Sequence, residues 1–258
     1  MTPNIFTFVS KKLESSAYKS KSFAMLKAIV SEADNNAISH ETMPGKHSSD
    51  VSHKNKGETA FQRALYYHSE GQIQLGKVAW CDIELPVTFS KKGRRRCVDL
   101  IGRLECCGDF LCELKYANPK SKKLPASNCP DYAVLEALLY YGLVQKNQGD
   151  LQKHKVWRKK LKLEFSWVDV AKSKTIMVLA NESFWNKAKN NLAASKRICE
   201  LVDSIQNELK VKVLLYKTPD FYFVKGPADK AGRYCPKIPD GADKWMPVRF
   251  EGASAKNP

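Results

Sequence analysis

The stretch RRRCVDLIGRLECCGDFLCELKYA, residues 94–117, decides how the rest of the chain is interpreted. Most of it has the apolar, β-branched and aromatic character of strands, yet Asp99, Glu113 and Lys115 lie inside the strand-like segments. Alternate residues of a strand share a face, so Glu113 and Lys115 lie on one side. If the strand that carries Asp99 pairs with the strand that carries Glu113, the two acids come together.

Two carboxylates held close repel each other, and burial makes both charges costly. A divalent cation between Asp99 and Glu113 removes that cost, and oxygen ligands suit Mg²⁺ or Mn²⁺. Lys115 beside such an ion can orient or help to deprotonate a water, or stabilise a charged phosphate. Together, these groups could catalyse the hydrolysis of a phosphodiester bond.

Each of these residues also has a simpler interpretation. Asp99 can cap a turn, or it can pair with Arg103 on the same side of its strand. Glu113 and Lys115 can form a solvated charge pair on an exposed sheet surface. The spacing E-x-K is common, so the hypothesis of a site depends on the apolar flanks and on the acid from a separate strand.

The pattern along the chain predicts one α/β sandwich with a mixed sheet. Three consecutive strand-like segments with short connections predict an antiparallel meander. Helices are expected at 57–71, 129–147 and 184–210, and strands at 77–90, 97–105, 110–117, 174–180 and 211–217. We expect three parts: an N-terminal helical arm and polar linker (1–56), the main domain (57–225) and an irregular C-terminal tail (226–258).

The spacing of 13 residues between Asp99 and the run Glu113-Leu114-Lys115 resembles the PD-(D/E)XK nuclease superfamily, which includes many restriction enzymes. The resemblance extends to the element order over roughly residues 57–217. It implies a restriction-endonuclease-like αβββαβ core, with a mixed central sheet flanked by helices. It also implies a Mg²⁺ ion, for which Mn²⁺ can substitute, bound by Asp99, Glu113 and the main-chain carbonyl of Leu114. Lys115 would be the catalytic lysine, and Glu58 on the first helix would join the catalytic residues.

The chain differs from the superfamily pattern in two places. Val98 stands where the motif's name has proline. RecB-like members carry Gln-x-x-x-Tyr on the helix after the lysine strand, whereas this chain has Glu136-Ala-Leu-Leu-Tyr140. The first difference is common in the superfamily, and the second argues against the RecB-type subclass.

The charge balance points to a polyanionic partner. Lys and Arg number 43 against 27 Asp and Glu, a difference of +16, which attracts polyanions, chiefly nucleic acid or an anionic membrane surface. Basic runs flank the proposed site, although any single lysine in them is ordinary for a solvated loop. The residues expected to contact nucleic acid are Arg94, Arg95, Arg96, Lys120, Lys122, Lys123, Lys155, Arg158 and Lys159.

No signal peptide or membrane span is evident, and the eight cysteines lack zinc-finger or CxxC spacing, which favours a cytoplasmic protein with free thiols. We therefore expect a metal-dependent DNA endonuclease acting on double-stranded DNA, with a Mg-bound water attacking the scissile phosphate. Cutting both strands often needs two sites, so a homodimer or a larger assembly is possible. The alternatives are a non-cleaving nucleic-acid-binding or assembly subunit with the same fold, and a ribonuclease.

Overall fold

The computed structural model describes residues 4–35, 57–68, 78–88, 96–104, 108–121, 129–151, 155–158, 163–189, 192–225, 234–237, 245–248 and 250. The helices are α1 (Ile5–Glu14), α2 (Ala24–Asn35), α3 (Glu58–His68), α4 (Pro130–Lys146), α5 (Gln148–Leu151), α6 (Trp167–Ser173), α7 (Glu182–Lys189) and α8 (Leu192–Ser204). Two 3₁₀ turns, η1 (Ser16–Tyr18) and η2 (Lys21–Phe23), join α1 to α2, and the π-helical turn η5 (Ile205–Leu209) ends α8. The strands are β1 (Val78–Thr88), β2 (Arg96–Leu104), β3 (Gly108–Lys115), β4 (Lys155–Arg158), β5 (Leu163–Ser166), β6 (Thr175–Asn181), β7 (Lys212–Thr218), β8 (Tyr222–Lys225), β9 (Tyr234–Lys237) and β10 (Met246–Pro247).

Six strands form one open mixed sheet in the order β1-β2-β3-β6-β7-β10. β1, β2 and β3 are an antiparallel meander, β6 and β7 run parallel to β3, and β10 adds an antiparallel edge. The connections from β3 to β6 and from β6 to β7 contain helices, as parallel pairing requires. The expected α/β class, the meander and the mixed sheet flanked by helices are therefore confirmed.

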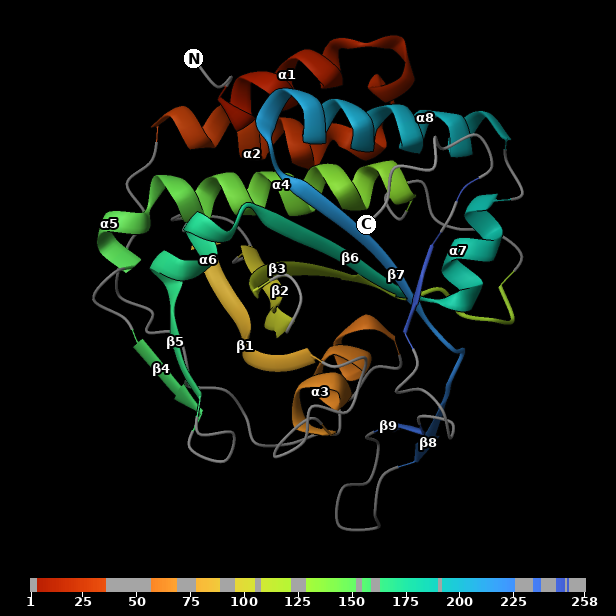
Figure 1. The fold of residues 1–258 in the computed structure, drawn as a ribbon. Coiled ribbons are helices and arrows are strands. Elements are labelled where there is room, and N and C mark those ends of the chain that lie inside the picture. Colours follow the sequence, from red (N-terminus) through yellow and green to blue (C-terminus); the bar gives the residue numbers. More distant parts are fainter. Residues whose placement is uncertain are drawn as a thin grey trace.

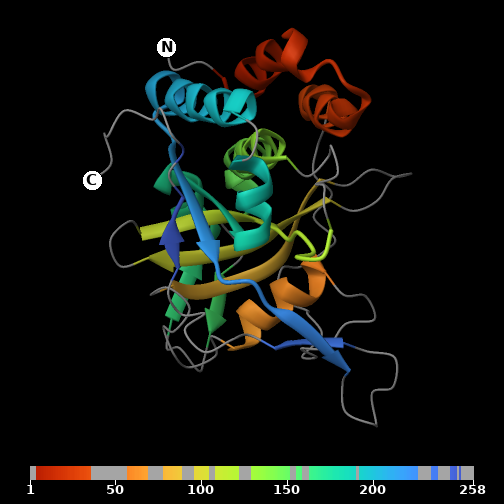
Figure 2. The same cartoon turned by 90° about the vertical axis from the view of Figure 1, so that its right-hand side faces the viewer.

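Helices cover the two faces of the sheet unequally (Figure 1). α4 lies across one face, and α1, α2 and α8 form a further layer on top of α4, as Figure 2 shows from the side. Every residue of α4 from 130 to 144 is buried, because the helix is enclosed between the sheet and this outer layer. The opposite face packs against α3, where Phe61 and Leu65 meet the apolar side chains of β1, β2 and β3.

The N-terminal segment is part of the main core. Apolar residues of α1 and α2 belong to the same buried cluster as α4 and the sheet. The helical arm predicted within residues 1–56 contains two α-helices, α1 and α2. α1 begins at the N-cap Asn4, whose side chain accepts a hydrogen bond from the Phe6 N–H at 2.8 Å.

Other elements differ in detail from the sequence-based expectation. The segment expected as one helix over 184–210 is divided into α7 and α8. The segment after β7 forms β8, which pairs with β9 in a separate two-stranded ribbon, so the C-terminal tail contributes β9 and the sheet-edge strand β10. The basic segment 153–162 contributes β4 to a hairpin with β5.

Two general expectations can be compared with the described residues. Among the described cysteines, Cys81, Cys97, Cys112, Cys129 and Cys199 form no disulfide bond. Among the described helices, none has the length and apolar character needed to cross a membrane.

Candidate active site at a fork between two strands

β2 and β3 separate at the point where the acids lie. Their ladder extends from Leu104↔Gly108 to Leu100↔Cys112, while β2 continues beside β1 to Arg96 and β3 continues beside β6 to Lys115. The register places Asp99 opposite Glu113 just beyond the last rung. There the N–H of Leu114 donates to Oδ2 of Asp99 at 2.8 Å, so a side-chain oxygen takes the role of a strand acceptor.

The first two turns of α3 close one side of this fork. Gln62 donates from Nε2 to the main-chain oxygen of Asp99 at 2.6 Å, which ties the helix to β2. One helical turn earlier, Glu58 extends toward the fork, and its Oε1 lies 3.9 Å from Nζ of Lys115. The side chain of Glu58 remains 38% exposed, so this part of the site borders solvent.

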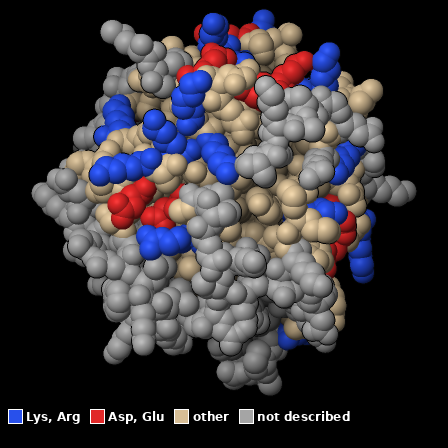
Figure 3. Space-filling model, viewed as in Figure 1, with Lys and Arg blue, Asp and Glu red and all other residues tan. Residues whose placement is uncertain are grey.

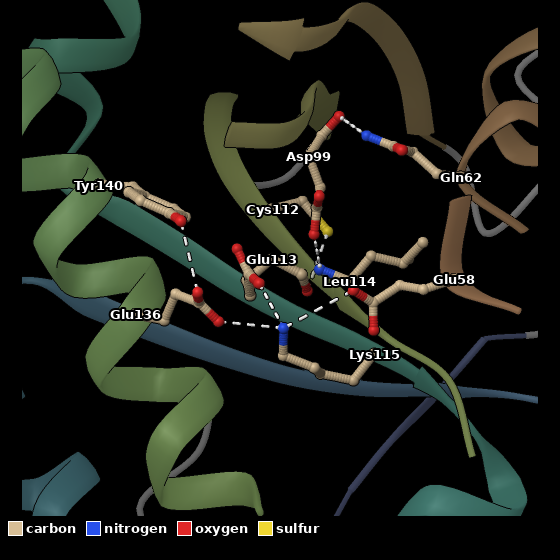
Figure 4. Close-up of polar contacts among 9 residues, drawn as sticks. All are labelled: Glu58, Gln62, Asp99, Cys112, Glu113, Leu114, Lys115, Glu136 and Tyr140. Carbon is tan, nitrogen blue, oxygen red and sulfur yellow. Dashed lines mark hydrogen bonds and ion pairs between the residues drawn. The ribbon is translucent and has the colours of Figure 1, made fainter. Parts of the chain in front are cut away.

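Lys115 lies at the centre of the acidic side chains (Figure 4). Its Nζ is 2.5 Å from Oε1 of Glu113 on the same strand and 3.0 Å from Oε2 of Glu136 on α4. Glu136 is held in turn by Tyr140, whose hydroxyl donates to Oε1 at 3.3 Å. Glu113, Lys115 and Glu136 are 3%, 5% and 5% exposed, so the ion pairs are almost completely removed from water.

Acidic side chains outnumber basic ones in this group. Four carboxylates, those of Glu58, Asp99, Glu113 and Glu136, act on one ammonium. Burial, followed by the charge of Glu58, raises the pKa of Asp99 to about 8. Burial and then the charges of Asp99 and Glu136 raise the pKa of Glu113 well above its ordinary value. For Lys115, burial lowers the pKa, but Glu113, Glu58 and the other acids outweigh it and raise the pKa well above the ordinary value.

Two buried carboxylate oxygens of the group lack a hydrogen-bond donor among the described residues, and one of them, Oε2 of Glu136, has the ammonium of Lys115 3.0 Å away. The other, Oε2 of Glu113, is buried and accepts no hydrogen bond from any described residue. A buried carboxylate oxygen without a donor is costly unless it holds a proton or binds a cation. The neighbouring potential ligands are carboxylate and carbonyl oxygens, which are the ligands that Mg²⁺ prefers. Mg²⁺ usually uses only one or two carboxylates and keeps several waters. The chemistry of the residues therefore fits a divalent ion.

The side chains do not form a ready-made cage. Among the described residues, no three acidic, histidine or cysteine side chains converge as ligands of a metal ion. The structure brings Asp99, Glu113 and Lys115 together at the fork and places Glu58 at its solvent side. For Leu114 it shows an N–H bonded to Asp99, and the expected role of its carbonyl stays a prediction.

A hydrogen-bonded clamp fixes the end of β3 just beyond Lys115. The fully buried Asn181 at the end of β6 donates from Nδ2 to the carbonyl of Ala117 at 2.8 Å and accepts from the Ala117 N–H at 2.8 Å. Nδ2 of Asn181 also donates to Oδ1 of Asp220 at 2.6 Å, and Asp220 accepts from the N–H of Ser183 at 2.9 Å. The backbone that carries Lys115 is therefore held from β6 and from the segment after β7.

For most of the predicted nucleic-acid-binding residues, the structure does not describe the side chain. Lys120 is described, exposed, and follows β3 closely. Arg96, Lys155 and Arg158 lie on strands whose side chains there are not described, and Arg94, Arg95, Lys122, Lys123 and Lys159 lie outside the described residues. On the face in Figure 3, the described basic side chains gather mainly over the helices at the upper left.

Sequence reasoning omitted Glu136 from the site, although the residue belongs to it. In the sequence, Glu136 stands out only as a departure from a family motif on its helix. Its signal was a single acid within AVLEALLYYGLV, residues 133–144, because an acid inside an all-round apolar helix has to be paired. Tyr140, one turn later, is the hydroxyl that the same helix provides to hold it.

Fold and site together define an α/β protein with a mixed open sheet and a buried cluster of acids around one lysine. No protein-family model matches the chain, and neither a curated protein nor a solved structure matches it significantly.

Proposed function

We propose that this protein is a metal-dependent DNA endonuclease that hydrolyses phosphodiester bonds at the β2–β3 fork. The observation that carries the proposal is the excess of buried carboxylates over cations, with Oε2 of Glu113 left without a donor. A surface-exposed salt network would not need such burial, and a purely structural ion pair would not need a second buried carboxylate oxygen without a donor.

The residues divide the work as follows. Asp99 and Glu113 would hold Mg²⁺, joined by the main-chain carbonyl of Leu114, with Mn²⁺ as a substitute. When bound, the ion would supply an activated water and neutralise charge on the phosphate. Lys115, fixed by the Asn181 clamp, would orient that water or the phosphate from the opposite side. Glu58 at the solvent side lies where a substrate would enter.

The rest of the chain supports a polyanionic substrate. The net charge of +16 attracts nucleic acid, while the site itself is acidic and needs a cation before a phosphate can approach. Lys120, which is exposed and follows Lys115 by five residues, would contact the nucleic-acid backbone next to the reacting phosphate.

The decisive experiment is plasmid cleavage with Mg²⁺ or Mn²⁺, with single-stranded DNA and RNA as parallel substrates. Asp99→Ala and Lys115→Ala are expected to lose cleavage while retaining DNA binding in a gel-shift assay. Glu200→Gln, an exposed acid on α8, is the matched control and should cut normally. Unchanged cleavage by either site variant would contradict the assignment. Metal-independent binding without cutting by the wild type would favour a non-cleaving subunit, and cleavage of RNA alone would favour a ribonuclease.

A further inference from the structure

The carboxylates of the site converge on an ammonium group. Oxygens of Glu113, Glu136 and Glu58 lie 2.5, 3.0 and 3.9 Å from Nζ of Lys115. They come from β3, α4 and α3, so three separate elements direct acids at one point. The positive charge that these three acids surround belongs to the chain itself, so in this structure the ammonium of Lys115 is their common counterion.

We propose that the ammonium of Lys115 is the resident counterion of this site, and that a divalent ion binds Glu113 only by displacing it. The inference rests on the proposed metal site and adds a competition between the chain's own cation and the metal. Besides Glu113, Glu136 on α4 holds Lys115 in this resting position.

Geometry favours displacement over simultaneous binding. Lys115 is 5% exposed and its partners Glu113 and Glu136 are 3% and 5% exposed, so the ammonium fills a space that little water enters. A Mg²⁺ or Mn²⁺ ion placed on Glu113 would be a second cation beside the first, in surroundings where like charges repel strongly. The repulsion falls when the ammonium moves away, and the long lysine side chain allows such movement.

Glu136 gives the resting position its stability. Its Oε2 faces Lys115, and its Oε1 is fixed by the hydroxyl of Tyr140 at 3.3 Å. After displacement, the carboxylates of Glu113 and Glu136 become available to the incoming ion, and the freed ammonium becomes available to a phosphate. The ammonium would thus compensate part of the charge of the buried acids when no metal is present.

The opposing arrangement would leave Lys115 in place. Oε2 of Glu113 has no donor, so a metal could bind that oxygen while Lys115 keeps its contact with Oε1. In that case the lysine and the ion would bridge one carboxylate and would not compete for it.

Calorimetric titration with Mn²⁺ separates the two arrangements. Lys115→Met keeps the length of the side chain and removes its charge, so the variant should bind Mn²⁺ about tenfold more tightly or better than the wild type. Lys196→Met, which removes an exposed lysine from α8, is the matched control and should leave the affinity unchanged. Equal or weaker binding by Lys115→Met overturns the inference.

A crystal structure of the wild type with Mn²⁺ supplies the second readout, which also applies if Lys115→Met fails to fold. We expect the ion on Glu113 and the Lys115 ammonium withdrawn from both Glu113 and Glu136. An ion bound with both ion pairs intact overturns the inference, even if Lys115→Met binds more tightly, because the gain would then be a charge effect at a distance. Failure of the inference with Mg²⁺-dependent cleavage intact leaves the proposed function standing. Absence of both Mn²⁺ binding and cleavage contradicts both.

Discussion

The carboxylate of Asp99 and the main-chain N–H of Leu114 are joined by a 2.8 Å hydrogen bond beyond the last rung of the β2–β3 ladder. The bond lets two strands part without leaving the N–H unsatisfied. The same side chain borders Glu113 across the fork. Asp99 is therefore a structural element of the sheet and a candidate ligand at once, and its variants must be tested for both properties.

Asp99 gives the metal-free protein a specific pH dependence. Its pKa in the folded protein is about 8, above the value of about 3.9 for an unfolded aspartate, so folding favours the protonated form. The folded state holds a proton that the unfolded chain has released, and the free energy of unfolding therefore falls as pH rises from about 4 to about 8. Asp99→Asn cannot ionise but can still accept from Leu114, so its stability should fall less over this window.

The measurement is thermal unfolding with a chelator at pH about 5, 7 and 9, where each kcal/mol corresponds to roughly 2–4 °C. Asp109→Asn is the comparison, because Asp109 pairs with Arg103 at the other end of β3. Parallel pH curves for the wild type and Asp99→Asn would refute the role given to Asp99.

Asn181→Ala tests the clamp behind Lys115. The substitution leaves the N–H and carbonyl of the Ala117 backbone without their side-chain partner in a buried place, and it also removes a donor to Asp220. The expected loss in the free energy of unfolding is roughly 2–4 kcal/mol by urea denaturation, since each buried unsatisfied group costs about 1–3 kcal/mol. Asn118→Ala, which removes an exposed acceptor for the Lys120 N–H, should cost far less. Equal losses for the two variants would argue against the clamp.

Gly142 tests how closely α1 packs on α4. A Cβ at this position would lie 3.0 Å from Cγ2 of Ile5 and 3.2 Å from Cζ of Phe6. Gly142→Leu should therefore force the two helices apart and lower the free energy of unfolding by roughly 1–3 kcal/mol or more. Gly149→Leu on α5 meets nothing within 4 Å of its Cβ and should be close to neutral. Full stability of Gly142→Leu in a denaturant titration would mean that α1 does not pack there.

Gly102 on β2 provides a test of the opposite face. A Cβ there would lie 2.5 Å from Cζ of its cross-strand neighbour Phe110. Gly102→Ala should cost roughly 1–3 kcal/mol by overpacking. Phe110→Leu in the same chain should recover part of that loss, so the two substitutions combine non-additively. Strict additivity in a double-mutant cycle would show that the two residues do not contact.

The main sheet was predictable because its strands are apolar and long enough for the sequence pattern of a strand to be recognised. The meander, α4 and the β6–β7 pair follow from such segments, each bounded by polar turns. α1 was missed although Ile5, Val9 and Leu13 have helical spacing, because a short helix at a chain end is weak as an isolated pattern. β4 was missed because it lies in a run of basic residues, where no apolar alternation marks a strand.

The site was predictable in part for a related reason. Strand alternation gives the common face of Glu113 and Lys115, and an antiparallel neighbour brings Asp99 beside them. The separation of β2 from β3 depends on tertiary packing, and alternation carries no information about it. Glu136 enters from a helix whose rotation about its axis is set by packing on the sheet, so its meeting with Lys115 at 3.0 Å could not be derived from spacing.

The enclosure of α4 has a consequence for how the chain assembles. α1 leaves the ribosome long before residues 130–146 are synthesised. Its apolar side therefore cannot pack on α4 until more than a hundred further residues have been added. Contacts this distant in sequence slow the search for the native state. Until they form, both helices expose apolar surfaces. Removal of the first 35 residues would leave one side of α4 permanently exposed to solvent. Shortened versions of this protein should therefore precipitate during expression, even with the residues at the β2–β3 fork unchanged.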